Sequence, residues 1–431
     1  MAHGLKTWAK VGAVLRDLFR RHWRRALLVR EWFRLNQESV HLLLAAVVGV
    51  LAGLANWIYF LCNQLLQLLL MGETGELLRA ASKIDPPWMR VLIPAVGGLA
   101  AGFVLHWGLK LLRSPGLTNL LEVVVAGDGR LSLRSGVINA VSSLLSISSG
   151  ASIGREGLII QISSTVASKL GQIAKWPPYR LRLLVACGSA AGLAAGCNAP
   201  IAGAVFAAQI VLGNFSMNMF APLVVSSVVA AIFSRGLLGV RQMYQATTTY
   251  DFTRLSELPW FILLGILSGV LGALFLKAMR AGQNQMNRWP MPIYVRLGLA
   301  GLVVGAIGIY YPQVWGNGYA TTNNLLGESS PQIKFLFWLL VAKFVATSIT
   351  IGAGTVGGVF TPTLFLGASL GSLFGAIIHE SDMGPSLPTG AFALVGMGSV
   401  LAATTHSPLL AILMIFELSL NYSVMPPLML A

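Results

Sequence analysis

Acidic side chains are scarce in this sequence, with 15 Asp and Glu against 30 Lys and Arg, and charged residues make up only 10% of its 431 positions. The net charge of +15 would suit a nucleic-acid partner if the cations covered a soluble surface. Instead the densest cluster lies at 20–25, with Arg30 and Arg34 behind it, directly before the first long apolar stretch. We therefore exclude nucleic acid and predict that this basic segment, residues 1–40, is cytoplasmic and lies against anionic lipid.

Cysteine is also rare. The three thiols, Cys62, Cys187 and Cys197, show neither CxxC nor Cys/His spacing, so we expect packing residues and neither a disulfide nor a metal site. The metalloprotease motif HExxH is missing. The neighbours His406 and Ser407 would not face each other on a helix. We predict that the protein is not an enzyme and holds no metal and no cofactor.

Apolar residues are abundant, at 55% of the chain. Long apolar stretches, near or above the ~20 residues that span a bilayer, lie at 41–70, 91–112, 219–233, 258–276, 297–311 and 335–350. Shorter ones at 137–147, 158–168 and 181–195 cannot cross upright, and 47 glycines run through the apolar parts. These features predict an all-α, polytopic membrane protein with tilted and broken helices.

The segment from Ser149 to Gly157 is the most informative one, because it places Glu156 at the start of the apolar run 158–162. A carboxylate at membrane depth persists mainly where it faces a cavity, a partner or a moving ion. Glycines before an apolar segment are typical of a helix start, whose free N–H groups favour negative charge. The competing interpretation is an interfacial capping acid paired with Arg155.

The two halves of the chain resemble each other. Residues 188–200 match 396–408 in Gly, Leu-Ala-Ala and Pro at one constant offset, and 152–154 match 355–357 at nearly the same offset. We predict an inverted internal repeat, with a first repeat at 41–240 and a second at 258–431. Chance similarity between glycine- and alanine-rich helices is the alternative.

The pathway segments favour an anion over a cation. A cation route would need several acids, yet only Glu156 and Glu417 lie clearly within apolar sequence. Glu417 is either a second ion-path acid or a packed acid bonded to a neighbouring helix. Backbone N–H groups at glycine-rich helix starts replace an anion's water and bind weakly enough to release it. A transporter of larger organic anions would need fixed charges or hydrogen-bonding side chains, and remains the alternative.

Three blocks resemble the CLC family of voltage-gated chloride channels and proton/chloride antiporters, in its ClcB-like bacterial branch. They are Gly154-Arg155-Glu156-Gly157, the run from Lys343 through Ala346-Thr347-Ser348 to Gly357-Gly358-Val359-Phe360-Thr361-Pro362, and Asn198-Ala199-Pro200-Ile201-Ala202-Gly203 with its repeat partner ending at Phe416-Glu417-Leu418. Together the blocks cover roughly residues 150–420.

The resemblance implies a homodimer in a bacterial inner membrane, with one anion pore in each protomer. Glu156 would be the gating glutamate, whose carboxylate occupies an anion site until protonation or displacement frees it. The anion-binding filter would consist of Gly154, Arg155, Gly157, Gly358, Val359, Phe360, Thr361 and Pro362. Within it, Arg155 would support the turn. The transported ion would be chloride, with protons as a partner if the protein is an antiporter.

The sequence departs from the family pattern at several positions. The first filter motif is weak, with Ser114 and Gly116 in the sequence Ser-Pro-Gly-Leu-Thr, and Leu158 stands where proline is usual. Ile210 occupies the position at which family exchangers carry an internal proton-accepting glutamate. An isoleucine cannot carry a proton, so we predict passive conduction, with proton-coupled antiport as the alternative.

The C-terminal end of the sequence also differs from the family pattern. The family's last helix contributes a tyrosine to the inner anion site, whereas this chain ends at Ala431 at the start of another apolar segment. We therefore interpret the second repeat as truncated, or its inner gate as differently built.

Overall fold

The computed structural model describes residues 37–72, 75, 77–84, 86–112, 123–124, 127–239, 244, 255–288, 291–327, 332–381 and 387–431. Over this part of the chain it contains sixteen α-helices, and the described residues form no β-structure beyond one isolated bridge. The prediction of an all-α protein is therefore confirmed. Residues 1–36 of the basic segment and the weak filter positions Ser114 and Gly116 lie outside the described residues.

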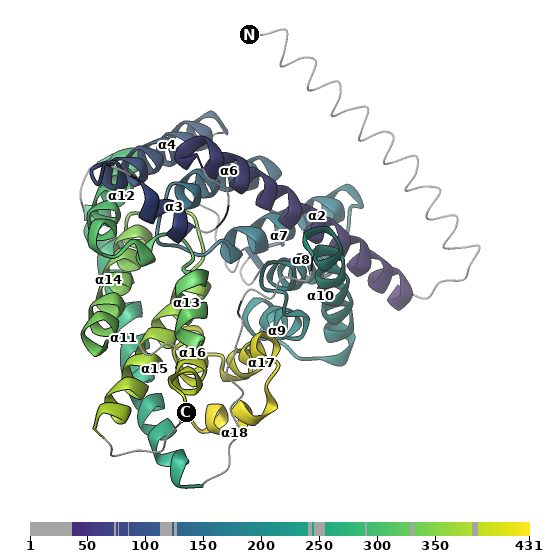
Figure 1. Cartoon of the computed structure of the whole chain (residues 1–431). Coiled ribbons are helices and arrows are strands. Elements are labelled where there is room, and N and C mark those ends of the chain that lie inside the picture. Colours follow the sequence, from purple (N-terminus) through teal and green to yellow (C-terminus); the bar gives the residue numbers. More distant parts are fainter. Residues whose placement is uncertain are drawn as a thin grey trace.

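The helices fall into two groups along the chain. The first group is α2 (Gln37–Met71), α3 (Leu77–Lys83), α4 (Met89–Leu112), α6 (Leu133–Ser148), α7 (Glu156–Ile173), α8 (Pro178–Cys197), α9 (Pro200–Phe206), the π-helical η1 (Ala207–Leu212) and α10 (Met217–Leu238). The second is α11 (Leu258–Arg288), α12 (Ile293–Tyr310), α13 (Tyr319–Leu326), α14 (Ile333–Gly352), α15 (Phe360–Glu380), α16 (Thr389–Thr405), α17 (Pro408–Ser419) and α18 (Met425–Leu430). Figure 1 shows α7 to α10 gathered on one side of the molecule and α11, α14, α15 and α16 on the other.

Eight of the described helices are long and apolar enough to cross a membrane: α2, α4, α8, α10, α11, α12, α14 and α15. The six long apolar stretches of the sequence all lie in this set. Two further spans were not expected. The stretch 181–195 looked too short, but α8 begins earlier, with Pro178 in its first turn, and includes Arg180 and Arg182. The span α15 was not expected because serines and glycines interrupt its apolar sequence. Its most apolar window is 89% buried.

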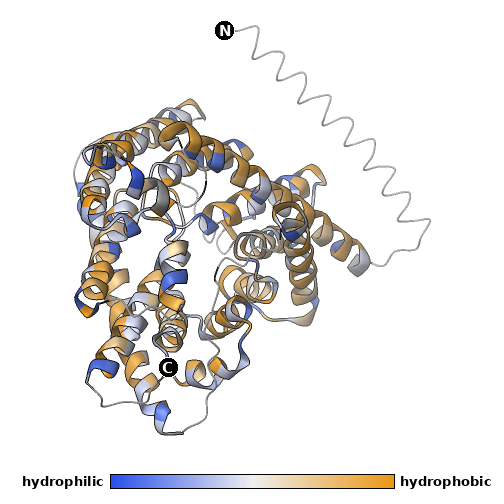
Figure 2. Ribbon diagram, viewed as in Figure 1, coloured by the Kyte–Doolittle hydropathy of each residue, from blue (hydrophilic) through white to orange (hydrophobic). Residues whose placement is uncertain are grey.

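The outer surface of the helices is suited to lipid. Figure 2 shows hydrophobic residues along much of α2, α4 and α10. Leu69 on α2 is 72% exposed, Leu111 on α4 is 86% exposed and Ile232 on α10 is 64% exposed. Apolar side chains exposed in such number are unfavourable in water and favourable in a hydrocarbon layer. Together with the spans, they define a multi-pass membrane protein.

Glycine allows α7 and α8 to approach closely. A Cβ at Gly188 would lie 2.7 Å from the Ser163 carbonyl oxygen, and one at Gly192 would lie 2.7 Å from the Ile160 Cα. Both positions are fully buried. Small residues let membrane helices pack backbone against backbone, so α7 packs closely on α8 from its first turn onward.

The two segments that match in sequence also match in backbone geometry. The C-cap residue of α8 is Asn198, with φ 60° and ψ 32°, and that of α16 is His406, with φ 53° and ψ 33°. Both left-handed residues are followed by an extended residue and then by a proline, Pro200 or Pro408, that begins the next helix. The similarity supports a repeat, whereas the boundaries at 41–240 and 258–431 remain a prediction.

Glu417 caps a neighbouring helix. Its Oε1 accepts a hydrogen bond from the Ile201 N–H at 2.9 Å, and its Oε2 accepts one from the Ala202 N–H at 2.8 Å. These two N–H groups are in the first turn of α9, where no intrahelical acceptor exists and where the helix dipole favours an anion. Of the two interpretations of Glu417, the contacts favour the packed acid.

We expect the Glu417→Gln variant to lower stability by about 1 kcal/mol, the usual size of a lost helix cap. The amide keeps one acceptor oxygen but turns its NH₂ group toward a backbone donor. Thermal unfolding in detergent measures the loss. Glu380→Gln, at the exposed end of α15, is the matched control. Its free energy of unfolding is expected to stay within about 0.5 kcal/mol of the parent's, as is usual for a surface substitution. Equal melting temperatures for the two variants would contradict the capping role.

Candidate functional site

The starts of two helices meet at a short antiparallel bridge. The Gly154 N–H donates to the Gly358 carbonyl at 2.8 Å, and the Gly358 N–H donates to the Gly154 carbonyl at 2.8 Å. Gly154 precedes α7 and Gly358 precedes α15, so segments about two hundred residues apart lie side by side. The bridge requires glycine, because a Cβ at Gly157 would lie 2.7 Å from the Gly358 Cα.

The bridge brings backbone donors of both helices to one place. Glu156 and Gly157 are the first residues of α7, while Val359 is the N-cap of α15 and Phe360 its first residue. The first N–H groups of a helix have no intrahelical acceptor, and the helix dipole adds partial positive charge there. Two such ends pointing into one region suit a small anion.

The remaining predicted filter residues lie around this bridge. Phe360 and Thr361 are buried, and so is Pro362. The Thr363 hydroxyl donates to the Phe360 carbonyl at 2.6 Å, which fixes the first turn of α15. A further contact links the Ser152 and Thr347 hydroxyls at 2.9 Å, so the turn before α7 also lies against α14.

Glu156 is the first residue of α7 and its side chain is 0% exposed. Its Oε1 accepts a hydrogen bond from the Tyr319 hydroxyl. Its Oε2 has no hydrogen-bond partner among the described residues. A side chain so fully enclosed does not fit the interpretation of Glu156 as an interfacial cap. A buried carboxylate with one oxygen unpaired is costly to retain, so Glu156 is a candidate functional residue.

Arg155 is the N-cap residue of α7. Its guanidinium carbon lies 5.4 Å from the centre of the Tyr319 ring. A cation over an aromatic face is attracted by the ring electrons. Arg155 therefore contacts the same tyrosine that binds Glu156.

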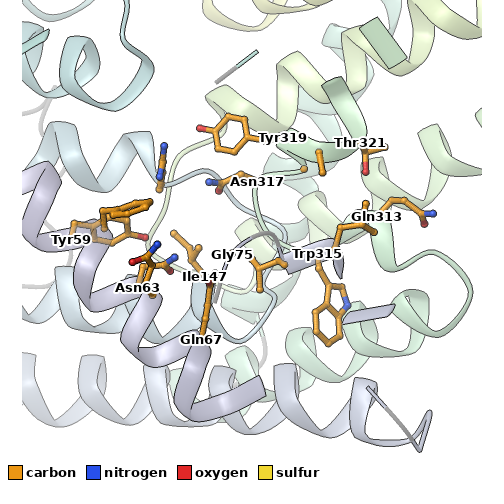
Figure 3. Close-up of a pocket in the computed structure, with 17 residues that line it drawn as sticks. Tyr59, Asn63, Gln67, Gly75, Ile147, Gln313, Trp315, Asn317, Tyr319 and Thr321 are labelled. Carbon is orange, nitrogen blue, oxygen red and sulfur yellow. The ribbon is translucent and has the colours of Figure 1, made fainter. Parts of the chain in front are cut away.

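A cavity of about 230 Å³ opens beside this cluster. Figure 3 shows its lining, in which Tyr59, Asn63 and Gln67 of α2 face residues of the segment that leads into α13. Arg155 and Tyr319 are also in the lining, whereas Glu156 is not. Tyr319 thus lies between the cavity and the buried carboxylate.

Tyr319 was missed in the sequence analysis. It lies more than 160 positions from Glu156 and belongs to none of the blocks that carry the resemblance. The two glycines in the preceding segment, Gly316-Asn317-Gly318, are a sequence signal for a tight turn. In the structure both adopt positive φ, 59° and 81°. Sequence shows that such a turn forms but not which side chain it presents to a distant helix.

The inner end of the expected pathway carries no acid in η1. Ile210 lies in this π-helical turn, half-buried against the hydrophobic core. Its neighbour Gln209 accepts a hydrogen bond from the Ser407 hydroxyl at 2.6 Å. Leu158, which replaces the usual proline of the second motif, is fully buried in the first turn of α7.

The fold and this site define a class, that of polytopic membrane proteins in which two glycine-rich helix starts meet inside the protein. Residues 97–431 match the family model described as "Voltage gated chloride channel". A ClcB-like chloride channel protein of Ralstonia nicotianae is 42% identical over 395 residues, 90% of this chain and 91% of that one. A voltage-gated ClC-type chloride channel of Citrobacter koseri is 35% identical over 90% of this chain and 93% of its own. The chain therefore belongs to the CLC family of voltage-gated chloride channels.

Solved structures agree on the fold. A slow cyanobacterial Cl⁻/H⁺ antiporter superposes with a TM-score of 0.79 at 23% identity, covering 92% of both chains. A CLC-type fluoride/proton antiporter superposes with a TM-score of 0.74 at 22% identity, covering 92% of this chain and 94% of its own. The CLC-type fold predicted from the sequence is confirmed.

Proposed function

We propose that the protein conducts chloride passively across a bacterial inner membrane, through a pore in each protomer, with Glu156 as the gate. The observation that carries the proposal is the Gly154–Gly358 bridge, which joins two helix starts beside a fully buried carboxylate. Proton-coupled chloride antiport through the same pathway is the second candidate. A homodimer with cytoplasmic N-termini belongs to the same proposal.

The filter chemistry follows from the helix starts. An unsolvated halide is very unfavourable in a dry interior unless donors replace its water. Backbone N–H groups from Gly157 and from Val359 to Thr361 supply those donors without a full positive charge. Binding is then weak enough for the ion to leave, which conduction requires.

The gate follows from charge competition. An ionised Glu156 is itself an anion at the start of α7, so it competes with chloride for the same donors. Protonation removes that charge, and the neutral side chain no longer occupies an anion site. Acid pH is therefore expected to raise chloride flux.

Separate observations favour passive conduction and proton-coupled antiport. Ile210 has no titratable group at the inner position, which favours passive conduction, and the curated relatives carry the name of channels. In favour of antiport, both superposed structures are proton antiporters. At 23% and 22% identity they are distant from this chain, so we place the channel first.

The test uses the full chain in proteoliposomes loaded with chloride, with valinomycin setting the potential and with chloride and external pH recorded together. Chloride efflux without proton movement is the result expected of a channel. Proton movement in fixed proportion, able to run against its own gradient, would establish the antiporter instead. Competition by small inorganic anions but not by carboxylates would separate either from an organic-anion transporter.

A further inference from the structure

Tyr319 is the side chain that lies between Glu156 and the cavity. It is the first residue of α13, half-buried, and lines the cavity on one side. On the other side its hydroxyl donates to Glu156 Oε1. Because Glu156 Oε2 has no partner among the described residues, this hydroxyl is the side-chain donor that the structure shows on the carboxylate.

The Tyr319 ring is contacted by Tyr244 and Arg155. The Tyr244 ring lies 5.2 Å away, centre to centre, at an interplanar angle of 65°. The Arg155 guanidinium carbon lies 5.4 Å from the ring centre. These contacts involve the ring and not the hydroxyl, so they position the hydroxyl without competing for it.

The backbone that carries Tyr319 is held as well. The Lys343 amine donates to the Val314 carbonyl at 3.0 Å and to the Gly316 carbonyl at 2.9 Å. Gly318, the N-cap of α13, has φ 81°, and a Cβ there would lie 2.8 Å from Cε2 of Phe365. The segment before Tyr319 therefore has one conformation fixed by α14 and α15.

We propose that Tyr319 is a latch that holds the Glu156 gate closed: its hydroxyl fixes the ionised carboxylate, and the gate moves aside only after this hydrogen bond breaks. The inference rests on the proposed role of Glu156. Tyr319 is a positioning residue in this scheme, since it acts on chloride through Glu156. Loss of this hydrogen bond is expected to change the pH dependence of chloride flux, because a hydroxyl donor stabilises negative charge on a carboxylate.

Other titratable groups are also near the carboxylate and stay in place when Tyr319 changes. Those within electrostatic range are Arg155, Tyr59 from α2, Cys197 from the end of α8, and Tyr244. Residues 359–362 at the start of α15 carry no titratable side chain. A change in the pH profile on loss of one hydroxyl therefore reports on that hydroxyl.

The test is the Tyr319→Phe variant of the full chain, with chloride flux measured in proteoliposomes over a pH series. Phenylalanine keeps the ring against Tyr244 and Arg155 and removes only the donor. We expect the pH at half-maximal flux to move upward by about one unit, the effect of losing one hydrogen bond to a charged group. Above the midpoint, flux is expected to rise by up to about tenfold, which is the same shift expressed as a protonated fraction.

Tyr244→Phe is the matched control, because its hydroxyl has no hydrogen-bond partner among the described residues while its ring packs on the same tyrosine. Its midpoint is expected to stay within about 0.3 unit of the parent, since no bond to the carboxylate is lost. A second control adds Tyr319→Phe to Glu156→Gln, where the latch has no ionised carboxylate to hold and the pH profile is expected not to change further.

The outcomes separate the latch from the gate. If Glu156→Gln alters flux but Tyr319→Phe leaves the midpoint unchanged, the latch is wrong and the gate stands. If Glu156→Gln has no effect on flux or its pH dependence, the proposed function of Glu156 is wrong and the latch falls with it. A midpoint shift that persists in the double variant would also overturn the latch, because the tyrosine would then act on another group.

Discussion

Replacing Glu156 with alanine is expected to raise chloride flux at neutral pH by roughly tenfold or more and to remove its dependence on pH. The estimate follows from a gate whose open state is a minor one, populated at roughly 10% or less. Alanine cannot occupy an anion site and cannot be protonated, so flux becomes constant at the level the filter allows. Chloride efflux from proteoliposomes at several pH values measures both effects.

Glu417→Gln is the matched control for Glu156→Ala, since it also removes an acid from apolar sequence. Its carboxylate binds the Ile201 and Ala202 N–H groups and not the helix starts of the bridge. The control is expected to retain pH-dependent flux. If Glu156→Ala behaved like this control, with flux and pH dependence unchanged, Glu156 would not be the gate. If the parent protein proves to be an antiporter, Glu156→Ala is expected to abolish proton movement while chloride still flows.

The parts of the site that sequence could predict are those set by local chemistry. A carboxylate between glycines at the start of an apolar run has few stable environments, so Glu156 could be predicted as a helix-start residue, while a buried position and an interfacial cap both stayed open. The segment 357–362 has the same local character, which predicted a second helix start. That the two starts meet at the Gly154–Gly358 bridge was expected only from the resemblance, because pairing between distant segments leaves no local pattern.

The parts that sequence missed depend on tertiary contacts. Tyr319 has no neighbouring motif, and its role comes from Glu156 in the other half of the chain. Helix α15 was missed as a span because its glycines, serines and threonines lower its apolar signal, although the helix is almost wholly enclosed by protein. A helix that faces protein on nearly all sides needs no lipid-compatible surface, so small and hydroxyl-bearing residues interrupt its apolar run, although the helix as a whole is still apolar enough to cross a membrane.

The second large expected effect is a loss of stability on replacing Lys343, which is 0% exposed in the middle of α14. Its amine binds the Val314 and Gly316 carbonyls and lies 5.0 Å from the centre of the Phe365 ring. In Lys343→Met the side-chain volume is nearly kept while both carbonyls lose their donor. Each buried unpaired carbonyl costs about 1–3 kcal/mol, and removal of a buried amine recovers part of this. We expect a net loss of about 2 kcal/mol in stability, measured by thermal unfolding in detergent.

Lys343→Met also tests how the latch is built. Because the lysine fixes the segment before Tyr319, its loss is expected to move the pH midpoint of flux in the same upward direction as Tyr319→Phe. Lys334→Met is the matched control, on the same helix but with an exposed side chain, and both stability and midpoint are expected to stay at the parent values. A destabilised Lys343→Met protein with an unchanged midpoint would mean that Tyr319 keeps its place through ring contacts alone. In that case Tyr244 and Arg155, which flank the ring, would be sufficient to position the hydroxyl on Glu156.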